Sequence, residues 1–540
     1  MHHHHHSSDA QMHSRDLESG EGPVDPRLGP SERPSVEELE QTVPEKLEEV
    51  FAHGQKSSSG TEKAISKETT LTEPTYIDFE KGDTRNPVNW SRRKKWTVTL
   101  WASGFTILAS SCAGSYNMGF PSMISDLDCS EFQATLGLSV YPLGFGIIPL
   151  VSASFSEEFG RQPLYLASTL IFGLMYLVIA LAQNIQTVII ARFIQGAVGS
   201  TGATMVGGTI ADVWRPHERG LPMAIFAFAA VGGTGLGPVY GGWIEMNPHL
   251  RWRWIQWIQM IICGAFGVFL PFVMKETRSA ILLTRLAKKM RKGTGDNRIR
   301  ARVEDERASL RTLIYISCTR PLYLLCTEPI VMAFSLWIGF AWGVIYAAIE
   351  SIGTVFRTLH SFNSGQIGTT FLTMVVGTSL GFATIMYQER LYRKYFPKKG
   401  IEARLYPACL AAILLPVGLL IYAWCSFPWV HWMALIIGLT TFMWASFMIY
   451  HTVFTYLADC YGPFASSALA AQSLFRNILG TVFPLFIQQM LHNLTFKWAG
   501  TLIAMLALLL LPIPFFLYVY GPAIRERSKF SRAVMDAQAR

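Results

Sequence analysis

The feature that most constrains this chain is a series of apolar stretches, each roughly 20 residues long, between residues 96 and 520. A helix of that length crosses the ~30 Å hydrocarbon core of a bilayer. Charged residues make up 16% of the chain, against about a quarter in soluble domains. The sequence therefore predicts an all-α membrane protein. We expect twelve spans, at 96–119, 132–155, 162–182, 186–209, 219–244, 253–274, 327–349, 365–387, 405–425, 429–450, 467–491 and 497–520.

Lysine and arginine residues are concentrated in alternate connections between these spans. They cluster just before the first span in SRRKKW (91–96), between the sixth and seventh spans, and in 389–404. Because basic residues are retained on the cytoplasmic side of a membrane, we expect both chain ends to be cytoplasmic. Basic residues between apolar runs face lipid headgroups, so membrane lipids are expected partners and nucleic acid is not.

The longest basic connection divides the spans into two sets of six. We expect a six-helix bundle at 87–274, a basic cytoplasmic loop at 275–320, a second six-helix bundle at 321–520 and a cytoplasmic tail at 521–540. Two such bundles around a midplane site are a common plan of secondary transporters. Residues 1–86 carry 18 Asp/Glu and 9 Lys/Arg with few aromatics, so we expect a disordered acidic cytoplasmic tail. Its opening histidine run, a tag remnant or a native segment, carries no functional inference.

The stretch GGTGLGPVYGG (232–242) invites comparison with a phosphate-binding glycine loop. Such a loop follows a strand and opens a helix with free N–H groups, whereas this stretch lies inside an apolar span. Gly233, Gly237 and Gly241 fall every four residues on one helix face, where glycine lets another helix approach closely. Pro238 removes one backbone hydrogen bond and favours a bend. We therefore expect a helix-packing surface.

The sequence shows no motif of a catalytic, nucleotide-binding or metal site. It has no Walker A pattern, and its eight cysteines form no C-x-x-C pair. We therefore expect no catalytic residue, no metal and no cofactor. Transport would then be driven by an ion gradient or by the gradient of the substrate itself.

The connection between the second and third spans contains SASFSEEFGRQPLY, at 152–165. It resembles the signature loop of the major facilitator superfamily, in its fungal form. In that family an acidic residue and an arginine form a charge relay that holds the cytoplasmic gate in one state. The resemblance implies that Glu157, Gly160 and Arg161 are gate residues. Glu158 stands where the family usually has a basic residue, which leaves one expected pairing in doubt.

The fourth span carries a charge about two turns inside its apolar stretch. A charge at that depth is costly, so Arg192 is a functional candidate by default, the alternative being that it snorkels to the interface. Arg192, Gln195 and Gly196 resemble the family motif R-x-x-Q-G, whose arginine is implicated in proton transfer. At the inner end of the same span, Asp212 and Arg219 resemble gate and topology determinants.

The glycine stretch of the fifth span resembles the antiporter motif that the exporters of the superfamily carry. The matching residues are Gly233, Gly237, Pro238, Gly241 and Gly242. Further segments, among them NPVNWS (86–91), WRWIQWI (252–258) and SSALAAQSLFRNILG (466–480), resemble fungal members of the twelve-spanner drug:proton antiporter family. The resemblance implies the major facilitator fold, with twelve transmembrane helices in two six-helix bundles. It also implies that the fifth span packs across the interface between the two halves.

Polar and aromatic side chains on otherwise apolar spans are the candidates for a substrate cavity. They are Tyr116, Asn117, Gln256, Trp337, Tyr346, Gln472, Arg476 and Asn477. The aromatic rings can stack on a hydrophobic or cationic ligand, or else face lipid or pack within the protein. No Asp or Glu lies near the middle of a span, which disfavours polyamines and favours a neutral, amphiphilic or anionic substrate. Proton coupling can run through Asp126, Glu245 or Glu350.

Together these observations predict a proton-coupled efflux transporter that exports a hydrophobic or amphiphilic small molecule by alternating access. Such molecules include drugs, toxins and secreted secondary metabolites, for example glycolipids or organic acids. The alternatives are a proton-coupled importer of a nutrient or polyamine, and a non-transporting sensor on the same fold. We expect a monomer in the plasma membrane rather than the vacuolar membrane. The sequon at Asn493 predicts a glycosylation site on the outer side.

Overall fold

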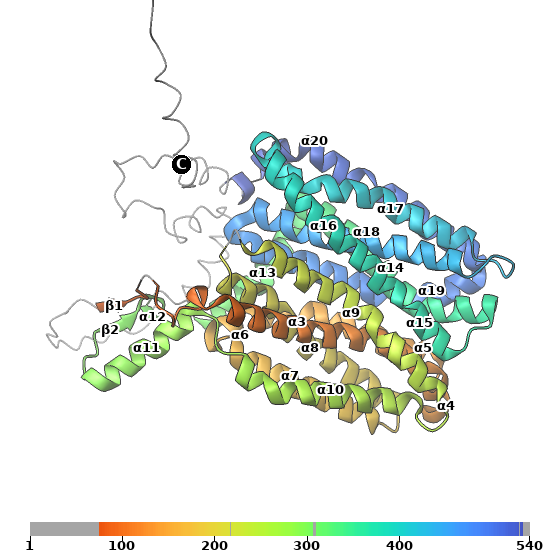
Figure 1. The fold of residues 1–540 in the computed structure, drawn as a ribbon, viewed down its shortest axis with the longest axis horizontal. Coiled ribbons are helices and arrows are strands. Elements are labelled where there is room, and N and C mark those ends of the chain that lie inside the picture. Colours follow the sequence, from red (N-terminus) through yellow and green to blue (C-terminus); the bar gives the residue numbers. More distant parts are fainter. Residues whose placement is uncertain (1–74, 81, 216–217, 306–308, 529, 533–540) are drawn as a thin grey trace, which may run out of the picture. The chain divides into compact units, whose positions relative to one another are not determined.

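The computed structural model describes residues 75–80, 82–215, 218–305, 309–528 and 530–532 (Figure 1). Every described residue belongs to one compact unit, Ile65–Arg540. The expected disordered tail therefore lies outside the described residues as far as residue 74, together with the histidine run.

Each of the first six expected spans coincides with helical structure. Two helices form the second span, which bends by 43° just before Pro149, a residue that has no N–H to donate. A 3-10 turn, η2 (Tyr116–Gly119), and a short helix, α4 (Phe120–Leu127), follow the first span. The spanning helices are α3 (Arg92–Ser115), α5 (Glu131–Ile147) with α6 (Pro149–Phe159), α7 (Arg161–Ala180), α8 (Ile185–Val213), α9 (Gly220–Met246) and α10 (Arg251–Val273).

The last six expected spans also coincide with helices. The eleventh and twelfth are separated at Thr495, whose φ of 64° breaks the helical geometry. The seventh extends to His360, past its expected end at 349. The helices are α14 (Pro329–His360), α15 (Ser364–Thr370) with α16 (Leu372–Lys399), α17 (Tyr406–Trp424), α18 (Met433–Tyr461), α19 (Ala465–Leu510) and α20 (Pro512–Arg527).

Among the described residues, seven helical segments are long and apolar enough to cross a membrane, and the bent pair α5–α6 makes an eighth. Two of the seven, Ser364–Trp424 and Ala465–Arg527, each contain two of the expected spans. The expected spans outside these segments lie on α3 and α8, which carry many serine, threonine and glycine residues. A multi-pass helical membrane fold follows.

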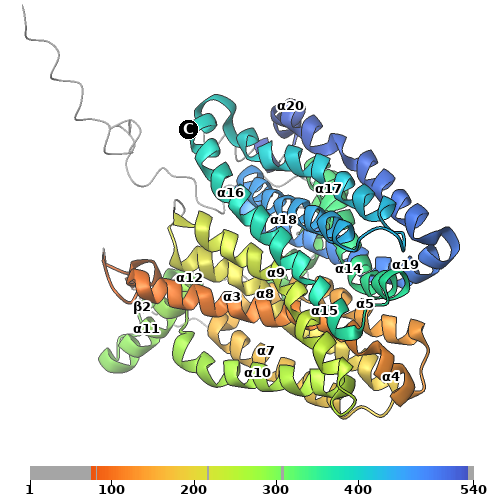
Figure 2. The same ribbon diagram turned by 45° about the vertical axis from the view of Figure 1, so that its right-hand side comes forward.

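The helices pack mainly with partners from the same half of the sequence. α3 packs along α9 and α5 along α8, while α14 packs along α19 and α17 along α18. Contacts between the halves join α5 to α19, and α9 to α15 and α16. Figure 2 shows α3 to α10 as one group and α14 to α20 as another. The residue boundaries of the two expected bundles remain a prediction, because Ile65–Arg540 forms one compact unit.

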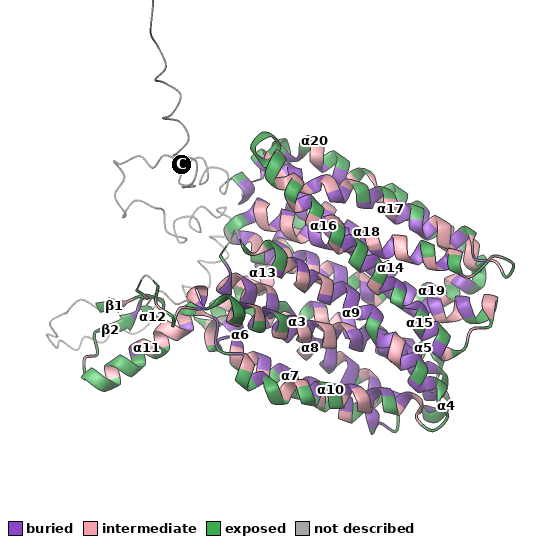
Figure 3. Ribbon diagram, viewed as in Figure 1, coloured by how far each residue is buried: buried purple, intermediate pink, exposed green. Residues whose placement is uncertain are grey.

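Apolar side chains cover much of the outside of this helical array, and polar ones lie within it. Phe272 on α10 and Leu509 on α19 are 78% and 74% exposed. Arg192 on α8 and Gln472 on α19 are completely buried. Figure 3 shows exposed residues along the outward faces of α10, α17 and α20. Lipid covers such apolar faces in a membrane, so the buried polar residues inside are candidates for function.

The basic segment between the halves is not a plain loop. It contains α11 (Ser279–Thr294), β2 (Ile299–Ala301), α12 (Arg302–Asp305) and the start of α13 (Leu310–Thr327). β2 pairs in parallel with β1 (Thr75–Ile77), with Thr75 opposite Ile299. Residues 75–77 were expected at the end of the disordered tail, and that expectation is wrong for them, because the partner strand supplies the backbone hydrogen bonds that the segment lacks alone.

Candidate functional site

Arg161, at the junction between α6 and α7, contacts Asp212 near the end of α8. We call the end of the helices where these two residues lie the gate end. Gly160 turns the chain there with φ 92°, a conformation that favours glycine. Arg161 opens α7, and its Nε donates to Oδ2 of Asp212, near the end of α8, at 2.5 Å. The side chain of Glu157 lies outside the described part of the structure. Arg219 caps the end of α8, donating to the carbonyl groups of Trp214 and Ala211.

Glu276 completes this ion-pair site, although the sequence argument missed it. It follows the end of α10 and accepts hydrogen bonds from the backbone N–H groups of Arg161 at 3.1 Å and Gln162 at 3.3 Å. These N–H groups have no partner within the first turn of α7, where the helix dipole also favours a carboxylate. A Cβ at Gly160 would lie 2.3 Å from Oε2 of Glu276, so only glycine admits this contact. The carboxylate thereby ties the start of α7 to the end of α10.

The second half of the chain carries a comparable ion-pair site. Arg404 lies in η4 (Gly400–Leu405), between α16 and α17, as Arg161 lies between α6 and α7. Its Nε donates to Oδ2 of Asp459, near the end of α18, and its Nη1 lies 3.4 Å from Oε1 of Glu389. Gly400 precedes it with φ 64°, again in the region that favours glycine. Each half therefore ties its helix ends together with the same kind of contact, an arginine paired with an aspartate.

The glycines of α9 form two rows that face different helices. Gly233 and Gly237 face α3, and a Cβ at Gly237 would lie 2.1 Å from the carbonyl O of Ser111. Gly241 lies on the same row, where a Cβ would meet Met118 at 3.3 Å. This row therefore packs within the first half, because α3 belongs to the same half as α9.

A second row of glycines on α9 makes contact with the other half. A Cβ at Gly235 would lie 2.7 Å from the carbonyl O of Phe371, and one at Gly242 would lie 2.3 Å from the carbonyl O of Ser364. In return, a Cβ at Gly368 of α15 would lie 2.3 Å from the carbonyl O of Pro238. α9 thus makes backbone-close contacts on both sides, as small residues allow in membrane helices.

Arg192 lies at the centre of the first half and is fully buried. Its guanidinium is held between the rings of Tyr116 and Tyr141, each 4.4 Å from Cζ. Nε donates to the carbonyl O of Gly137 at 3.2 Å, and Nη1 donates to Oε1 of Gln195 at 3.1 Å. Nη2 has no hydrogen-bond partner among the described residues. The arginine does not snorkel, and its charge is balanced by rings and carbonyl groups.

Arg476 on α19 is the second buried arginine, with 4% of its surface exposed. Its Cζ lies 4.4 Å from the ring of Trp342 on α14 and 5.0 Å from the ring of Tyr450 on α18. Nη2 donates to Oγ of Ser473 at 3.3 Å, but Nε and Nη1 have no partner among the described residues. Gln472 lies one turn earlier on α19, and neither its Nε2 nor its Oε1 has a partner there. The two side chains share a helix face, because they are four residues apart.

Other expected cavity residues pack near these two arginines. Tyr346 on α14 lies beside Trp342, with ring centroids 6.2 Å apart, and Trp342 in turn lies against Arg476. Asn477 donates from Nδ2 to the carbonyl O of Ser473 at 2.8 Å. Gln256 is buried with an unpartnered Oε1, and Trp337 packs against Phe334. The structure therefore groups Tyr346 and Arg476 but gives Trp337 a packing environment.

Asn117 and Glu350 make hydrogen bonds that join the halves away from the gate end. Asn117 donates from Nδ2 to the carbonyl O of Ile349 on α14. The next residue, Glu350, is 5% exposed, and its Oε1 accepts a hydrogen bond from Oγ1 of Thr135 on α5 at 2.9 Å. Its Oε2 has no partner among the described residues. Glu350 is thus a buried carboxylate at the interface between the halves, with one free oxygen.

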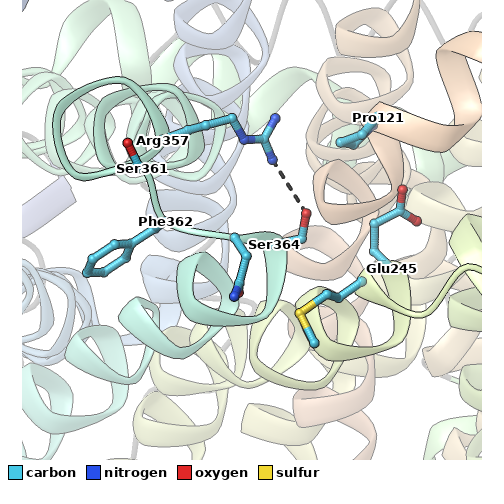
Figure 4. A pocket seen from close by; sticks show the side chains of 8 residues that line it. Pro121, Glu245, Arg357, Ser361, Phe362 and Ser364 are labelled. Carbon is cyan, nitrogen blue, oxygen red and sulfur yellow. Dashed lines mark hydrogen bonds between the residues drawn. The ribbon is translucent and has the colours of Figure 1, made fainter.

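A cavity of about 600 Å³ opens at the end of α9 opposite the gate end (Figure 4). Glu245 lies on one side of it and accepts hydrogen bonds from N and Oγ of Ser122, at 2.9 and 2.8 Å. Arg357 of α14 lies on the other side, with Nη2 3.5 Å from Oγ of Ser364 (Figure 4). Both halves line this cavity, so it is a candidate opening of the path between them.

Comparison with known proteins decides the family. The profile of the Major Facilitator Superfamily matches residues 101–481. The chain belongs to the major facilitator superfamily. It is 32% identical over 505 residues to the major facilitator superfamily multidrug transporter mdrA of Aspergillus fumigatus, covering 92% of this chain and 83% of that protein. It is 31% identical over 508 residues to the efflux pump FUBT of Fusarium oxysporum, covering 93% and 85% respectively. The efflux pump atB of Aspergillus terreus is 38% identical over 398 residues, covering 72% of this chain and 83% of that protein.

This membership makes the chain a multi-pass membrane transporter, as the sequence predicted. The fold class is confirmed as the all-α major facilitator fold. The roles of the individual gate, coupling and cavity residues remain predictions. For Glu276 a signal was present in the sequence, since an acidic residue lies two positions beyond the apolar span 253–274.

Proposed function

We propose that this transporter is a proton-coupled exporter that moves a hydrophobic or amphiphilic small molecule out of the cell. The proposed substrates are secreted secondary metabolites, drugs and toxins. The names of relatives support efflux, since they include a multidrug transporter and two efflux pumps that match most of the chain.

The observation that carries the proposal is the double packing of α9. One glycine row brings α9 against α3 in the first half, and Gly235 and Gly242 bring it against α15 and α16 in the second half. A helix held this closely on both sides excludes side chains, water and ions from the interface. Such a seal suits an exporter, which must move substrate against its gradient without letting protons leak between the halves.

Proton coupling is assigned to the buried carboxylates at the end opposite the gate. Glu350 joins the halves through Thr135 and has a free Oε2 that can take up a proton. An ionised carboxylate is costly in this setting without a cation, so a change in protonation changes the contact between the halves. At the gate end, the Arg161–Asp212 ion pair and Glu276 hold the closed arrangement of α7, α8 and α10.

We further propose that the transporter works as a monomer in the plasma membrane, with both termini cytoplasmic and no cofactor besides the proton gradient. The acidic tail and Asn493 have no assigned role in transport. Import by symport and a non-transporting sensor are the competing functions. The α9 seal is favourable for export and gives a sensor no advantage.

The test compares a deletion strain of the source organism with its parent. Metabolites retained in the cells and secreted into the medium are measured by mass spectrometry. Export predicts at least one compound that accumulates inside the deletion strain and falls in its medium. Import predicts the opposite change, and a sensor predicts altered synthesis without altered distribution. In proteoliposomes with an acidic interior, the purified transporter should accumulate the compound found, and a protonophore should abolish that accumulation.

A further inference from the structure

The two buried arginines of this transporter differ in how completely the protein satisfies them. Arg192 donates three hydrogen bonds to protein carbonyl and amide oxygens and a fourth to the Sγ of Cys112, and two tyrosine rings enclose it. Arg476 donates one bond, at 3.3 Å, and leaves Nε and Nη1 without a partner among the described residues. A buried guanidinium with unused donors is costly, because each unmade hydrogen bond leaves its desolvation uncompensated. Arg192, which leaves only Nη2 unused among the described residues, is therefore held by the protein, whereas Arg476 is available to a ligand.

The unused donors around Arg476 come from neighbouring side chains as well. Trp342 Nε1 and Gln472 Nε2 are also buried without a partner among the described residues. Gln472 Oε1 is the one acceptor of this set. The cluster thus offers a positive charge and four donor atoms against a single acceptor. Within the described residues, no carboxylate forms an ion pair with Arg476.

We infer that Arg476, Gln472 and Trp342 form a subsite for a carboxylate carried by an aromatic or otherwise planar apolar body. The guanidinium fork matches the two oxygens of a carboxylate, and Gln472 lies one helical turn away on the same face. The rings of Trp342 and Tyr450 flank the guanidinium at 4.4 and 5.0 Å, and they present apolar surface to the body of such a ligand. This inference rests on the proposed export function and narrows its substrate class to amphiphilic organic acids.

The subsite lies where a movement of the two halves could release its ligand. Gly480 lies one turn beyond Arg476 on α19. A Cβ added at Gly480 would lie within 3.6 Å of three side chains, those of Trp342 and Tyr346 on α14 and of Pro142 on α5. The subsite is therefore next to the contact between the halves, where α5 packs on α19. A ligand bound by Arg476 would be released when α19 moves relative to α5, as alternating access requires.

The test measures binding to the purified full-length transporter in lipid nanodiscs. The probes are pairs that share a body and differ in one group: 2-naphthoate with 2-naphthamide, and octanoate with octanamide. The cation 2-naphthylmethylammonium completes the set. We expect the carboxylates to bind about tenfold to a hundredfold more tightly than the matched amides, as charge-assisted hydrogen bonds imply.

Variants separate the subsite from general binding. Arg476→Gln should remove the preference for carboxylate while leaving amide binding within about twofold, and Arg476→Lys should keep part of it. Arg393→Gln, at an exposed arginine on α16, is the matched control and should keep the preference in full. Equal binding of acid and amide, tighter binding of the cation, or an unchanged preference in Arg476→Gln overturns the subsite. The same holds if no carboxylate binds, since the cluster would then hold water only.

A transport assay distinguishes failure of the subsite from failure of the proposed function. If 2-naphthoate binds in an Arg476-dependent way but no probe accumulates in proteoliposomes with an acidic interior, the export proposal fails and the subsite stands. If 2-naphthamide accumulates and the acid shows no advantage, export stands and the subsite fails.

Discussion

Replacing Gly237 by alanine is the sharpest test of how α9 packs. The added Cβ would lie 2.1 Å from the carbonyl O of Ser111 and 2.9 Å from N of Ser115. Both atoms belong to the backbone of α3, so no side chain can rotate away, and ordinary contact begins only near 3.4 Å. α3 and α9 must then separate by roughly 1 Å, and overpacking of this kind costs about 1–3 kcal/mol.

The assay combines the Tm of the purified transporter with export per molecule at the cell surface. Gly237→Ala should lower the Tm and reduce export, whereas Gly264→Ala on α10 should change neither. Gly264 has open space where its Cβ would lie, so it controls for the substitution itself. Gly241→Ala should be intermediate, because its nearest neighbour is the flexible side chain of Met118 at 3.3 Å. If Gly237→Ala matches Gly264→Ala in both measurements, the packing argument is refuted.

Three further predictions concern charged groups. Glu276→Gln should expose the start of α7 to protease about tenfold faster, because the first-turn N–H groups lose a charged acceptor, and limited proteolysis measures this. Glu350→Gln should abolish accumulation driven by a pH gradient while substrate exchange without a gradient persists; accumulation at the original level would rule out Glu350 as the proton carrier. The guanidinium of Arg291 holds the pKa of Glu304 below its usual value. Their contact therefore stabilises the α11–α12 segment at neutral pH and is lost as the pH falls through that lowered pKa. Hydrogen exchange over 288–305, corrected for intrinsic rates, should rise there and should lose this step in Arg291→Gln.

The helices could be predicted from the sequence because hydrophobic length alone determines them. A stretch of about 20 apolar residues has no alternative to a helix in lipid, where every backbone group must be satisfied internally. The same reasoning identified Arg192 and Arg476, since a charge inside such a stretch stands out against its surroundings.

The contacts that each residue makes with other helices could not be predicted in the same way, because they depend on how the helices are arranged. Spacing placed Gly233, Gly237 and Gly241 on one face, but it could not say that the face meets α3. Gly235 and Gly242 lie on a different face and make the contact between the halves. Glu276 was missed for a related reason: it lies outside the spans, and its role depends on the N–H groups of a helix that begins 115 residues earlier in the chain.

Different residues of the transporter serve the direction of transport and the selection of the substrate. The α9 contacts are made by backbone atoms and glycine, so they have no chemistry with which to distinguish one substrate from another. The donors around Arg476 lie on α14 and α19 and take no part in the α9 contacts. Substitution of Gly237 should therefore weaken export of acids and amides alike, whereas substitution of Arg476 should weaken export of the acids alone. Because the two sites share no residue, their effects on the free energy should add in the double variant. A strong departure from additivity would mean that the seal and the subsite respond to the same movement of α19 relative to α5.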